Sequence, residues 1–390
     1  MEFAKRLDNV SGSAIRAIFA LLEQPGMISF AGGNPAPDCF PSDDVADIAH
    51  KLLHKDGSVV LQYGGTPGAA KLKDIVIEMV GKRGITATPD QVIITSGSTQ
   101  GIGLAAKSLI NPGDVILSES PTFIGALQTF LTYEANVIGV KMDEHGMDIE
   151  ALEAAIIEHN PKFVYTIPTF QNPTGRTLSD QRRRDMVRVC DKHGVLIVED
   201  DPYSDLRYSG QPLAPIKSYD KNNTVIHLMS FSKIISPGLR VGAAIADPRV
   251  IAKYNVCKQG EDLHTPNLSQ AIVTAYVKSG KLPKHIAKIN AVYKAKRDAM
   301  LAKLKSFPDS ITYTVPDGGL FIWLELPGGV DAMPIFEQAV ENKVAFVPGT
   351  HFYPDGSGQN TMRLNFSMAS LAQIDEGMDI LREVVEQNIK

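Results

Sequence analysis

Short runs of β-branched residues alternate with amphipathic stretches between about residues 91 and 247. The runs are QVIITS, DVILS, ANVIGV, FVYTI, VLIVED, VIHLM and VGAAIA, and stretches such as TQGIGLAAKSLI and SDQRRRDMVRVCDKHG separate several of them. Turn residues support the boundaries, for example Gly194 directly after the helix expected to end at His193. This alternation predicts an α/β fold in which helices cover both faces of a mostly parallel sheet.

The pattern changes after about Lys284. A long charged helix candidate leads to the strands ITYTV and LFIWLEL, a helix, the short strands VAFV and MRLNF, and a closing helix. Elements in this order predict a smaller α+β domain. The chain begins with one amphipathic helix and the extended ISFAGG, too little to fold alone. We expect an N-terminal arm at 1–50 that packs with the small domain, a large domain at 51–283 and a small C-terminal domain at 284–390.

Composition narrows the class of protein. The chain has 390 residues, 44% of them hydrophobic and 21% charged, so it can bury a sizeable core and is not disordered as a whole. Its 39 Lys and Arg and 44 Asp and Glu give a net charge of -5 and are mixed along the chain, so nucleic acid is not an expected partner. Three scattered cysteines, and no long apolar stretch or signal-like leader, lead us to expect a cytoplasmic protein without a disulfide framework, a metal site or a membrane segment.

The most informative stretch for chemistry is MSFSKIISPGLRVG, at residues 229–242. Lys233 follows a predicted buried strand and is flanked by Ser230 and Ser232, with Arg240 seven residues further on. Hydroxyls and a guanidinium that converge on one spot suit a phosphate. A lysine beside such a site can bind the phosphate or condense with an aldehyde. Taken alone, an exposed loop lysine explains the stretch about as well.

Further polar residues follow strands at the edge where open α/β sheets bind ligands. Asp200 ends the strand VLIV and could keep a ring nitrogen protonated, while Ser98 and Thr99 lie in the glycine-rich turn TSGSTQG, which could cradle a phosphate. Asn172 lies in the constrained turn QNPTG. Arg363 lies in a short apolar strand and needs a partner, for which a carboxylate is the natural choice. Each feature alone also has a structural explanation, such as a capped or tight turn.

Together and in this order, the segments resemble the fold-type I pyridoxal-phosphate enzymes, specifically the class I and II aminotransferases. The resemblance runs from ISFAGGNP to MRLNFS, and the pattern SxSKxxxPGLRxG is highly specific. The N-terminal SAIRAIFALLEQPGMISFAGGNPAPDCFP and the segment LQYGGTPGAAKLKD are most similar to the 2-aminoadipate and kynurenine aminotransferase branch. The resemblance implies a large domain with a mostly parallel seven-stranded sheet and a smaller α+β domain.

The resemblance also implies roles for the residues around the cofactor. Lys233 would bond to the aldehyde of pyridoxal 5'-phosphate and then move the proton. Asp200 would pair with the pyridinium nitrogen, and Tyr203 and Asn172 would donate hydrogen bonds to the ring 3-oxygen. Phe123 lies where many relatives place a tyrosine stacked on the ring, so stacking is kept while a phenol hydrogen bond is not. The phosphate would be held by Ser98, Thr99, Ser230, Ser232 and Arg240, joined by Tyr63 of the partner subunit in a homodimer.

For the substrate, the resemblance implies that Arg363 binds the α-carboxylate, helped by Asn172 and the backbone near Gly33. Arg16, on the N-terminal helix, could meet a distal carboxylate, or it could be an ordinary surface arginine. The implied reaction moves the amino group of an L-amino acid, such as 2-aminoadipate or an aromatic or branched amino acid, to 2-oxoglutarate by a ping-pong mechanism.

Other activities fit parts of the sequence. A β-lyase could use Lys233 and Asp200 equally well, and the same domain serves as a cofactor-binding sensor in bacterial regulators. No basic helix-turn-helix precedes the domain here, so a regulator is not favoured. The segment SFSK also matches the SxxK of serine β-lactamases, but neither KTG nor SDN occurs in the chain. His50 and His54 have helical spacing, but HKLLH lacks the glutamate of HExxH, so a helix face is favoured over zinc.

Overall fold

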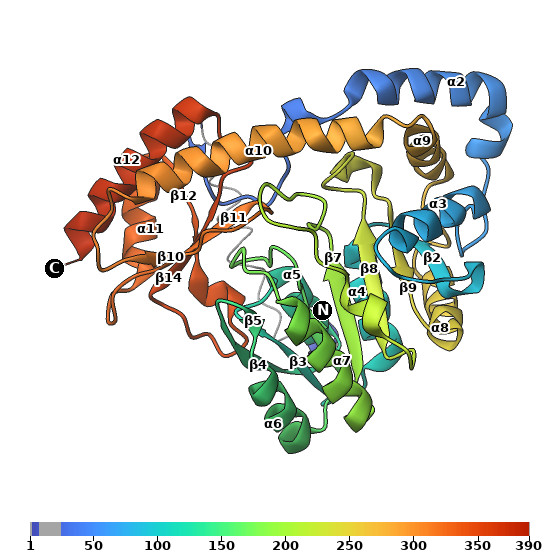
Figure 1. Cartoon of the computed structure of the whole chain (residues 1–390), viewed down its shortest axis with the longest axis horizontal. Helices are drawn as coiled ribbons and strands as arrows, with labels where there is room; N and C mark the ends of the chain where they lie inside the picture. The colour runs from blue at the N-terminus through green and yellow to red at the C-terminus, as the bar shows by residue number, and fades with distance from the viewer. Residues whose placement is uncertain (1, 8–24, 390) are drawn as a thin grey trace.

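The computed structural model describes residues 2–7 and 25–389. Its centre is an eight-stranded sheet (Figure 1), whose strands follow the order β2 (Val92–Thr95), β9 (Gly242–Ile245), β8 (Val225–Ser230), β7 (Leu196–Asp201), β6 (Phe163–Thr166), β3 (Val115–Ser120), β4 (Asn136–Asp143) and β5 (Gly146–Met147). Neighbours from β8 to β4 are parallel, whereas β9 runs antiparallel to both β8 and β2. The predicted mostly parallel sheet is confirmed.

The sheet has one strand more than the seven expected. The chain turns at residues 144–145 directly after β4, and the two-residue β5 folds back antiparallel on it. The pairs Met142 with Met147 and Asp143 with Gly146 make this small hairpin. Because β5 is so short, it leaves no β-branched run in the sequence from which a strand could be predicted.

Helices cover both faces of the sheet. Side chains alternate between the faces along a strand, so Phe163 and Val198 pack into one hydrophobic cluster, and their neighbours Val164 and Ile197 pack into a second. The first face is covered by α4 (Ser98–Leu109), α5 (Ile124–Thr132) and α8 (Pro248–Gln259), and the second by α6 (Ile149–His159), α7 (Asp180–His193) and the 3-10 turn η4 (Ile216–Tyr219).

The ends of α7 show how local sequence sets an element. The Ser179 hydroxyl accepts a hydrogen bond from the backbone N–H of Arg182, a cap whose loss typically costs about 1 kcal/mol. At the other end Gly194 adopts the left-handed conformation with φ 67°, which confirms the predicted helix end at His193. This helix begins directly after the loop that carries Asn172, so its start helps to set where that loop lies.

The C-terminal elements form a four-stranded antiparallel sheet in the order β10 (Thr312–Tyr313), β11 (Phe321–Glu325), β14 (Thr361–Asn365) and β13 (Val347–Pro348). The helices packed around it are α10 (Leu282–Leu304), α11 (Ala332–Glu341) and α12 (Leu371–Asn388). The predicted strand VAFV is divided between two sheets, since β12 (Val344–Ala345) pairs in parallel with β1 (Ile28–Ser29) while β13 pairs with β14. The pairing of β1 ties the ISFAGG segment to the C-terminal part of the chain.

The remaining helices extend over one end of the large sheet (Figure 1). The helix α2 (Ser42–Val60) packs on α9 (Asn267–Lys278), and α3 (Ala70–Gly81) packs on α9 and β2. Short 3-10 turns complete the chain: η1 (Lys5–Leu7), η2 (Pro37–Cys39), η3 (Pro89–Gln91), η5 (Pro237–Leu239) and η6 (Gly349–Phe352). Since α2 runs through residue 50, the first domain boundary falls within a helix, and the division into 1–50, 51–283 and 284–390 stays a prediction.

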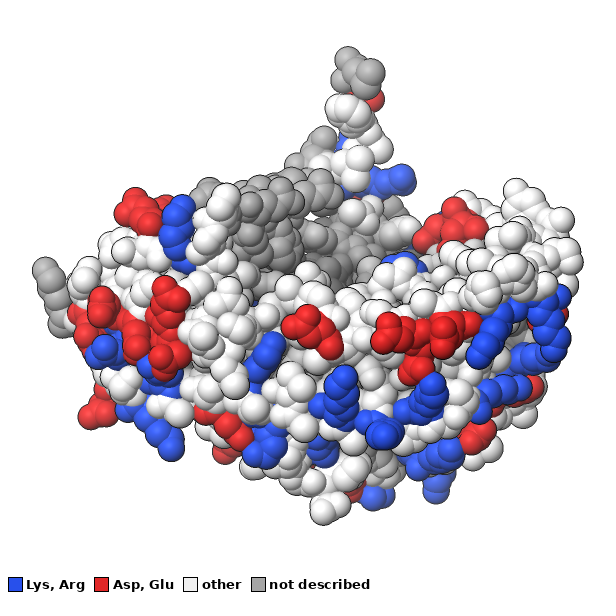
Figure 2. Space-filling view, turned by 90° about the horizontal axis from the view of Figure 1, so that it is seen from above, with Lys and Arg blue, Asp and Glu red and all other residues white. Residues whose placement is uncertain are grey.

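The surface agrees with the mixed charge of the sequence. On the face seen in Figure 2, groups of acidic and basic side chains lie close to one another. None of the helices in the described part of the chain combines the length and apolar character needed to cross a bilayer.

Candidate active site

A cavity of about 400 Å³ lies where β6, β7 and β8 end, between the large sheet and the C-terminal elements. The predicted site residues that line it are Gly33, Ser98, Thr99, Phe123, Asn172, Asp200, Tyr203, Ser230, Ser232, Lys233, Arg240 and Arg363. A larger cleft of about 610 Å³, lined by Arg207 and Tyr313 among others, contains none of them. Segments far apart in the sequence therefore converge on the smaller cavity.

Lys233 is placed just beyond the end of β8. Its Nζ donates a hydrogen bond to the carbonyl oxygen of Gly33 at 2.7 Å. Burial, together with the positive charges of Arg363 and Arg240, lowers the pKa of Lys233 to about 8. An amine with such a pKa is partly neutral near pH 7 to 8, so it can act as a nucleophile or a base.

Asp200 ends β7 with its side chain 2% exposed. Burial raises the pKa of Asp200 to about 7, which the hydrogen bond from the Tyr165 hydroxyl to Oδ2, 2.9 Å long, partly opposes. The Ser98 hydroxyl also lowers this pKa, although it makes no full hydrogen bond to either oxygen. The other oxygen, Oδ1, has no hydrogen-bond partner among the described residues. A buried carboxylate with one unsatisfied oxygen on a cavity wall is suited to accept a proton-bearing group of a bound molecule.

Arg363 enters the cavity from β14. Its Nη1 donates to Oδ1 of Asn172 at 2.7 Å, and Nη2 donates to the carbonyl oxygen of Ala31. The guanidinium lies 4.4 Å from the ring centre of Phe321 and 4.9 Å from that of Phe352. Burial lowers the pKa of Arg363 to about 10, and none of the described residues forms an ion pair with it. A buried cation held by neutral acceptors has the charge and geometry to bind a carboxylate.

Two rings and an amide line the cavity between these charges. Tyr203 is buried, its ring lies edge to face with Phe321 at 5.9 Å, and burial raises its pKa while the nearby Asn172 amide lowers it. Phe123 directly precedes α5 and is half-buried. The structure therefore brings Tyr203 and Asn172 together, as the sequence predicted, beside an aromatic face that a planar ligand could stack on.

One end of the cavity is a cradle for an anion. Ser98 and Thr99 are the first residues of α4, so their N–H groups lie at the positive end of the helix dipole. The Ser230 hydroxyl donates to that of Ser232 at 3.0 Å. Arg240 reaches the same place, and its Nη2 donates to the carbonyl oxygen of Ser96 at 2.8 Å. A helix N-terminus, hydroxyls and a guanidinium together suit a phosphate.

Gly97 is needed for this arrangement. It precedes α4 with φ 84°, a conformation that side chains rarely adopt. A Cβ atom there would lie 2.5 Å from Nη2 of Arg240, so any other residue would displace that guanidinium.

The remaining predicted site residues are not placed in the cavity. Tyr63 is 79% exposed and lies on the surface, with its ring edge to face with that of His264 at 6.0 Å. Arg16 lies outside the described residues.

Sequence reasoning missed two buried polar side chains beneath the site, Tyr165 and Glu119. Tyr165 pairs in register with Val198, so it shares a face of the sheet with Asp200, and this depends on a strand register that the sequence does not give. Glu119 is the residue before the last in β3, and burial raises its pKa to about 7 despite hydrogen bonds from Thr166, the backbone of Ile167 and Gln171. The predicted strand DVILS stopped before this residue, although a glutamate directly after an apolar run was a visible signal.

Comparisons with known proteins agree with this geometry. A family model described as "Aminotransferase class I and II" matches residues 25–381. Aromatic-amino-acid aminotransferase 1 of Thermococcus litoralis is 41% identical over 395 residues, which cover 100% of this chain and 95% of that protein. The 2-aminoadipate transaminase of Thermus thermophilus is 39% identical over 380 residues, covering 96% and 94%. The crystal structure of Pyrococcus horikoshii kynurenine aminotransferase, in complex with PMP, is similar with a TM-score of 0.96 at 40% identity, covering 100% of this chain and 98% of that one.

Proposed function

The chain belongs to the aminotransferase class I and II family, and we propose that it transfers the amino group of an aromatic, branched or 2-aminoadipate-like L-amino acid to 2-oxoglutarate by a ping-pong mechanism. As a member of this family it is a pyridoxal-phosphate-dependent aminotransferase. The observation that carries the proposal is the cavity itself. It combines a lysine that is partly neutral near pH 8, a carboxylate with one oxygen that has no partner among the described residues, an anion cradle and an arginine without an ion-pair partner among them.

The residues fit the cofactor. Pyridoxal phosphate supplies an electron-accepting ring, which stabilises negative charge at the substrate α-carbon. The unsatisfied Oδ1 of Asp200 would accept a hydrogen bond from the ring nitrogen, and Tyr203 and Asn172 would bind the ring 3-oxygen. Phe123 would stack on the ring. The phosphate would lie in the cradle formed by Ser98, Thr99, Ser230, Ser232 and Arg240.

The reacting groups of the chain then have distinct tasks. Nζ of Lys233, with its pKa lowered to about 8, would take the proton from the substrate α-carbon and return it to the former aldehyde carbon of the cofactor. Arg363 binds the α-carboxylate in a bidentate manner and so orients the α-proton toward Lys233. The buried aromatic rings of Phe321 and Phe352 beside Arg363 keep water from that ion pair.

The substrate class is inferred from the relatives and from the cavity wall. The relatives named above act on aromatic amino acids, 2-aminoadipate and kynurenine according to their names. Phe123, Ile124 and Phe352 give the cavity here a largely apolar wall, which suits aromatic and branched side chains, and Gln128 adds one polar side chain. A contact between Arg16 and a distal carboxylate stays part of the proposal.

We propose further that the enzyme is a cytoplasmic homodimer. Apolar side chains are unusually exposed along and after α2, with Leu53 at 42%, Val59 at 69%, Leu61 at 70% and Tyr63 at 79%. Burying such a patch against a second copy would remove it from water. Tyr63 would then reach the phosphate of the partner subunit. Analytical ultracentrifugation is expected to show a dimer, and a fully active monomer would contradict this part of the proposal.

The deciding experiment is an absorbance spectrum with added pyridoxal phosphate, before and after each of a panel of amino acids without oxo acid. We expect the band of the lysine-bound cofactor to give way to that of the pyridoxamine form, and 2-oxoglutarate to reverse the change. Release of pyruvate and ammonia instead would identify a β-lyase, and the absence of any cofactor band would refute the cofactor assignment. The lyase and sensor alternatives are not favoured, because the relatives named above, 41% and 39% identical to this chain, are named as aminotransferases.

A further inference from the structure

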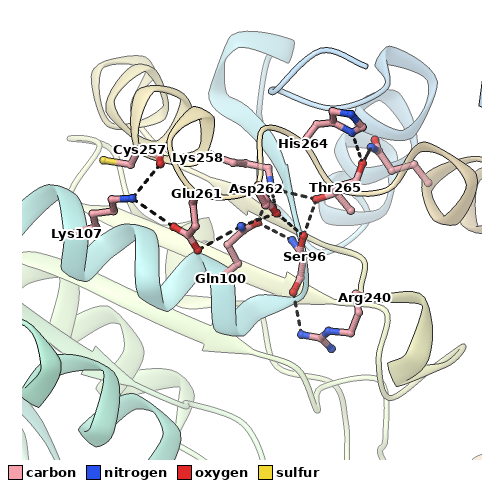
Figure 3. A network of polar contacts seen from close by, with 11 residues as sticks. Ser96, Gln100, Lys107, Arg240, Cys257, Lys258, Glu261, Asp262, His264 and Thr265 are labelled. Carbon is pink, nitrogen blue, oxygen red and sulfur yellow. Dashed lines mark hydrogen bonds and ion pairs between the residues drawn. The ribbon is translucent and has the colours of Figure 1, made fainter. Parts of the chain in front are cut away.

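A polar network of side chains surrounds the turn at the start of α4 (Figure 3). It joins Lys258, near the end of α8, and Asp262, in the following turn, to Ser96 and Gln100. We call Lys258 and Asp262 the anchor pair, and residues 95–100, which carry the cradle's N–H groups, the phosphate turn. Neither member of the anchor pair lines the cavity.

Lys258 of the anchor pair is buried, whereas Asp262 is partly exposed. The Lys258 side chain is 0% exposed, and its Nζ lies 2.9 Å and 3.0 Å from the two oxygens of Asp262. Burial lowers the pKa of Lys258, and the carboxylate of Asp262 opposes that shift. Burial would raise the pKa of Asp262, but hydrogen bonds from Lys258, Gln100 and Ser96 outweigh it and hold the pKa low. Both groups are therefore charged, and they form an ion pair with each other.

The anchor pair holds the phosphate turn at several atoms. Ser96 Oγ and Gln100 Nε2 donate to Oδ2 of Asp262 at 2.9 Å and 2.8 Å. Gln100 Oε1 in turn accepts from Lys258 Nζ and, at 2.8 Å, from the backbone N–H of Ser96. Because the Ser96 carbonyl accepts from Arg240, the position of that guanidinium is tied to the same network.

The network also reaches the segment that ends in Tyr63. Thr265 Oγ1 contacts both Lys258 Nζ and Ser96 Oγ at 3.2 Å, and the carbonyl of Thr265 lies 2.9 Å from Nδ1 of His264. Nε2 of His264 accepts from the backbone N–H of Gly64, the residue after Tyr63. One cluster therefore supports the phosphate turn and the segment that, in the proposed dimer, completes the partner's phosphate site.

We propose that Lys258 and Asp262 are positioning residues that hold the phosphate turn and Arg240 in the shape required by the cofactor phosphate, and so set the affinity for that phosphate. This inference rests on the proposed function, because it takes the ligand of the cradle to be pyridoxal phosphate. Two effects combine. A turn held in place before binding loses less conformational freedom when the phosphate arrives. Lys258 also neutralises a carboxylate that would otherwise repel the phosphate dianion.

The test compares pyridoxal phosphate with pyridoxal, which lacks the phosphate, by absorbance titration of the cofactor-free protein. Lys258→Met is expected to weaken binding of pyridoxal phosphate by roughly 10- to 100-fold, the range seen when residues that support metal ligands are removed. It should leave the affinity for pyridoxal unchanged. The matched control is Lys217→Met, which removes another buried lysine, paired with Asp220 at 2.7 Å beneath the opposite face of the sheet. This control should bind both compounds like the wild type.

A second variant guards against a folding defect in Lys258→Met. Ser96→Ala removes only the hydroxyl that reaches Asp262, and it should weaken pyridoxal phosphate selectively, though less. In the double variant Lys258→Met with Asp262→Asn, no uncompensated carboxylate remains, so affinity should partly recover. Equal losses for both compounds in these variants, or no loss at all, would overturn the proposal. A wild-type protein that fails to bind pyridoxal phosphate would instead refute the proposed function.

Discussion

Neighbouring carboxylates on the two sides of strand β7 differ in their hydrogen-bond partners. On the side of the second hydrophobic cluster, Glu199 accepts hydrogen bonds from the backbone N–H groups of Ile216 and Lys217 and lies 2.8 Å from the His227 ring. On the same side Asp201 pairs with Arg83. On the cavity side, Asp200 has a single hydrogen bond, from Tyr165, and one oxygen without a partner among the described residues.

Glu199 and Asp201 therefore support the fold, whereas Asp200 is available to bind a ligand. A buried polar group without a partner costs roughly 1 to 3 kcal/mol, so the fold tolerates the free oxygen of Asp200 at the expense of stability. The same free oxygen is what a protonated ring nitrogen needs. Both oxygens of Glu199 have partners, and although Oδ1 of Asp201 also has none among the described residues, Asp201 is paired with Arg83 and does not line the cavity.

The largest expected effect is on activity. Asp200→Asn should lower kcat on the order of 10²- to 10³-fold, the range seen when one electrostatic partner of a reacting group is removed, because an amide cannot hold the ring nitrogen protonated. Asp201→Asn makes the same chemical change one residue along and should keep a rate close to that of the wild type. Single-turnover absorbance with a good amino donor measures both. Comparable losses in the two variants would show that the two sides of β7 do not differ in function.

A smaller effect, of opposite sign in the two variants, is expected on the stability of the cofactor-free protein. The pKa of Asp200 is raised from 3.8 to about 7, so the folded state holds its proton longer, and the free energy of unfolding falls as pH rises from about 4 to about 7. Above that window Asp200→Asn should therefore stabilise the protein, by about 1 to 2 kcal/mol after allowance for relaxation. The pKa of Asp201 is lowered, with Arg83 overcoming the effect of burial, so its contribution is present above about pH 4.

Asp201→Asn should accordingly destabilise the protein at pH 8, by about 2 kcal/mol, less than for a fully buried pair because Arg83 is 25% exposed. Urea unfolding of the cofactor-free variants at pH 5 and pH 8 measures these changes. Asp200→Asn should also reduce the pH dependence of stability, though only in part, because burial raises the pKa of Glu119 to about 7 as well. A loss of stability in Asp200→Asn at pH 8 would show that the unpaired charged carboxylate of Asp200 does not destabilise the fold.

The sequence allowed Asp200 to be chosen from the run EDD, but not from periodicity alone. Strand ends indicate the edge of the sheet where ligands bind, and this places the loops after VLIV, FVYTI and VIHLM together. Asp200 was the first candidate among three consecutive acids because of its place at the strand end, and the family resemblance supported that choice, since strand alternation gives two sets of residues and not the face that each set occupies. The positions of Lys233, Arg240 and Arg363 on the cavity wall were predicted in the same way.

Contacts between residues distant in sequence could not be predicted. Tyr165 contacts Asp200 only because β6 and β7 are neighbours in the sheet with a particular register. Lys258 was not identified as a site residue, since nothing in the sequence indicates that the phosphate turn lies beside it. The two-residue β5 and the division of VAFV between two sheets depend on pairing partners far along the chain.

The smallest expected effect tests whether the hydrogen bond from Tyr165 maintains the charge of Asp200. The Tyr165 hydroxyl favours the charged form of Asp200, and a hydrogen bond to a charged group contributes about 1.5 to 3 kcal/mol. Tyr165→Phe should lower kcat by roughly tenfold, which corresponds to about 1.4 kcal/mol, and leave KM for the amino donor unchanged because Tyr165 does not line the cavity. The control is Tyr254→Phe, which removes a buried hydroxyl that has no partner among the described residues. A loss confined to KM, or an equal fall in kcat for Tyr254→Phe, would mean that the hydrogen bond from Tyr165 does not maintain the charge of Asp200.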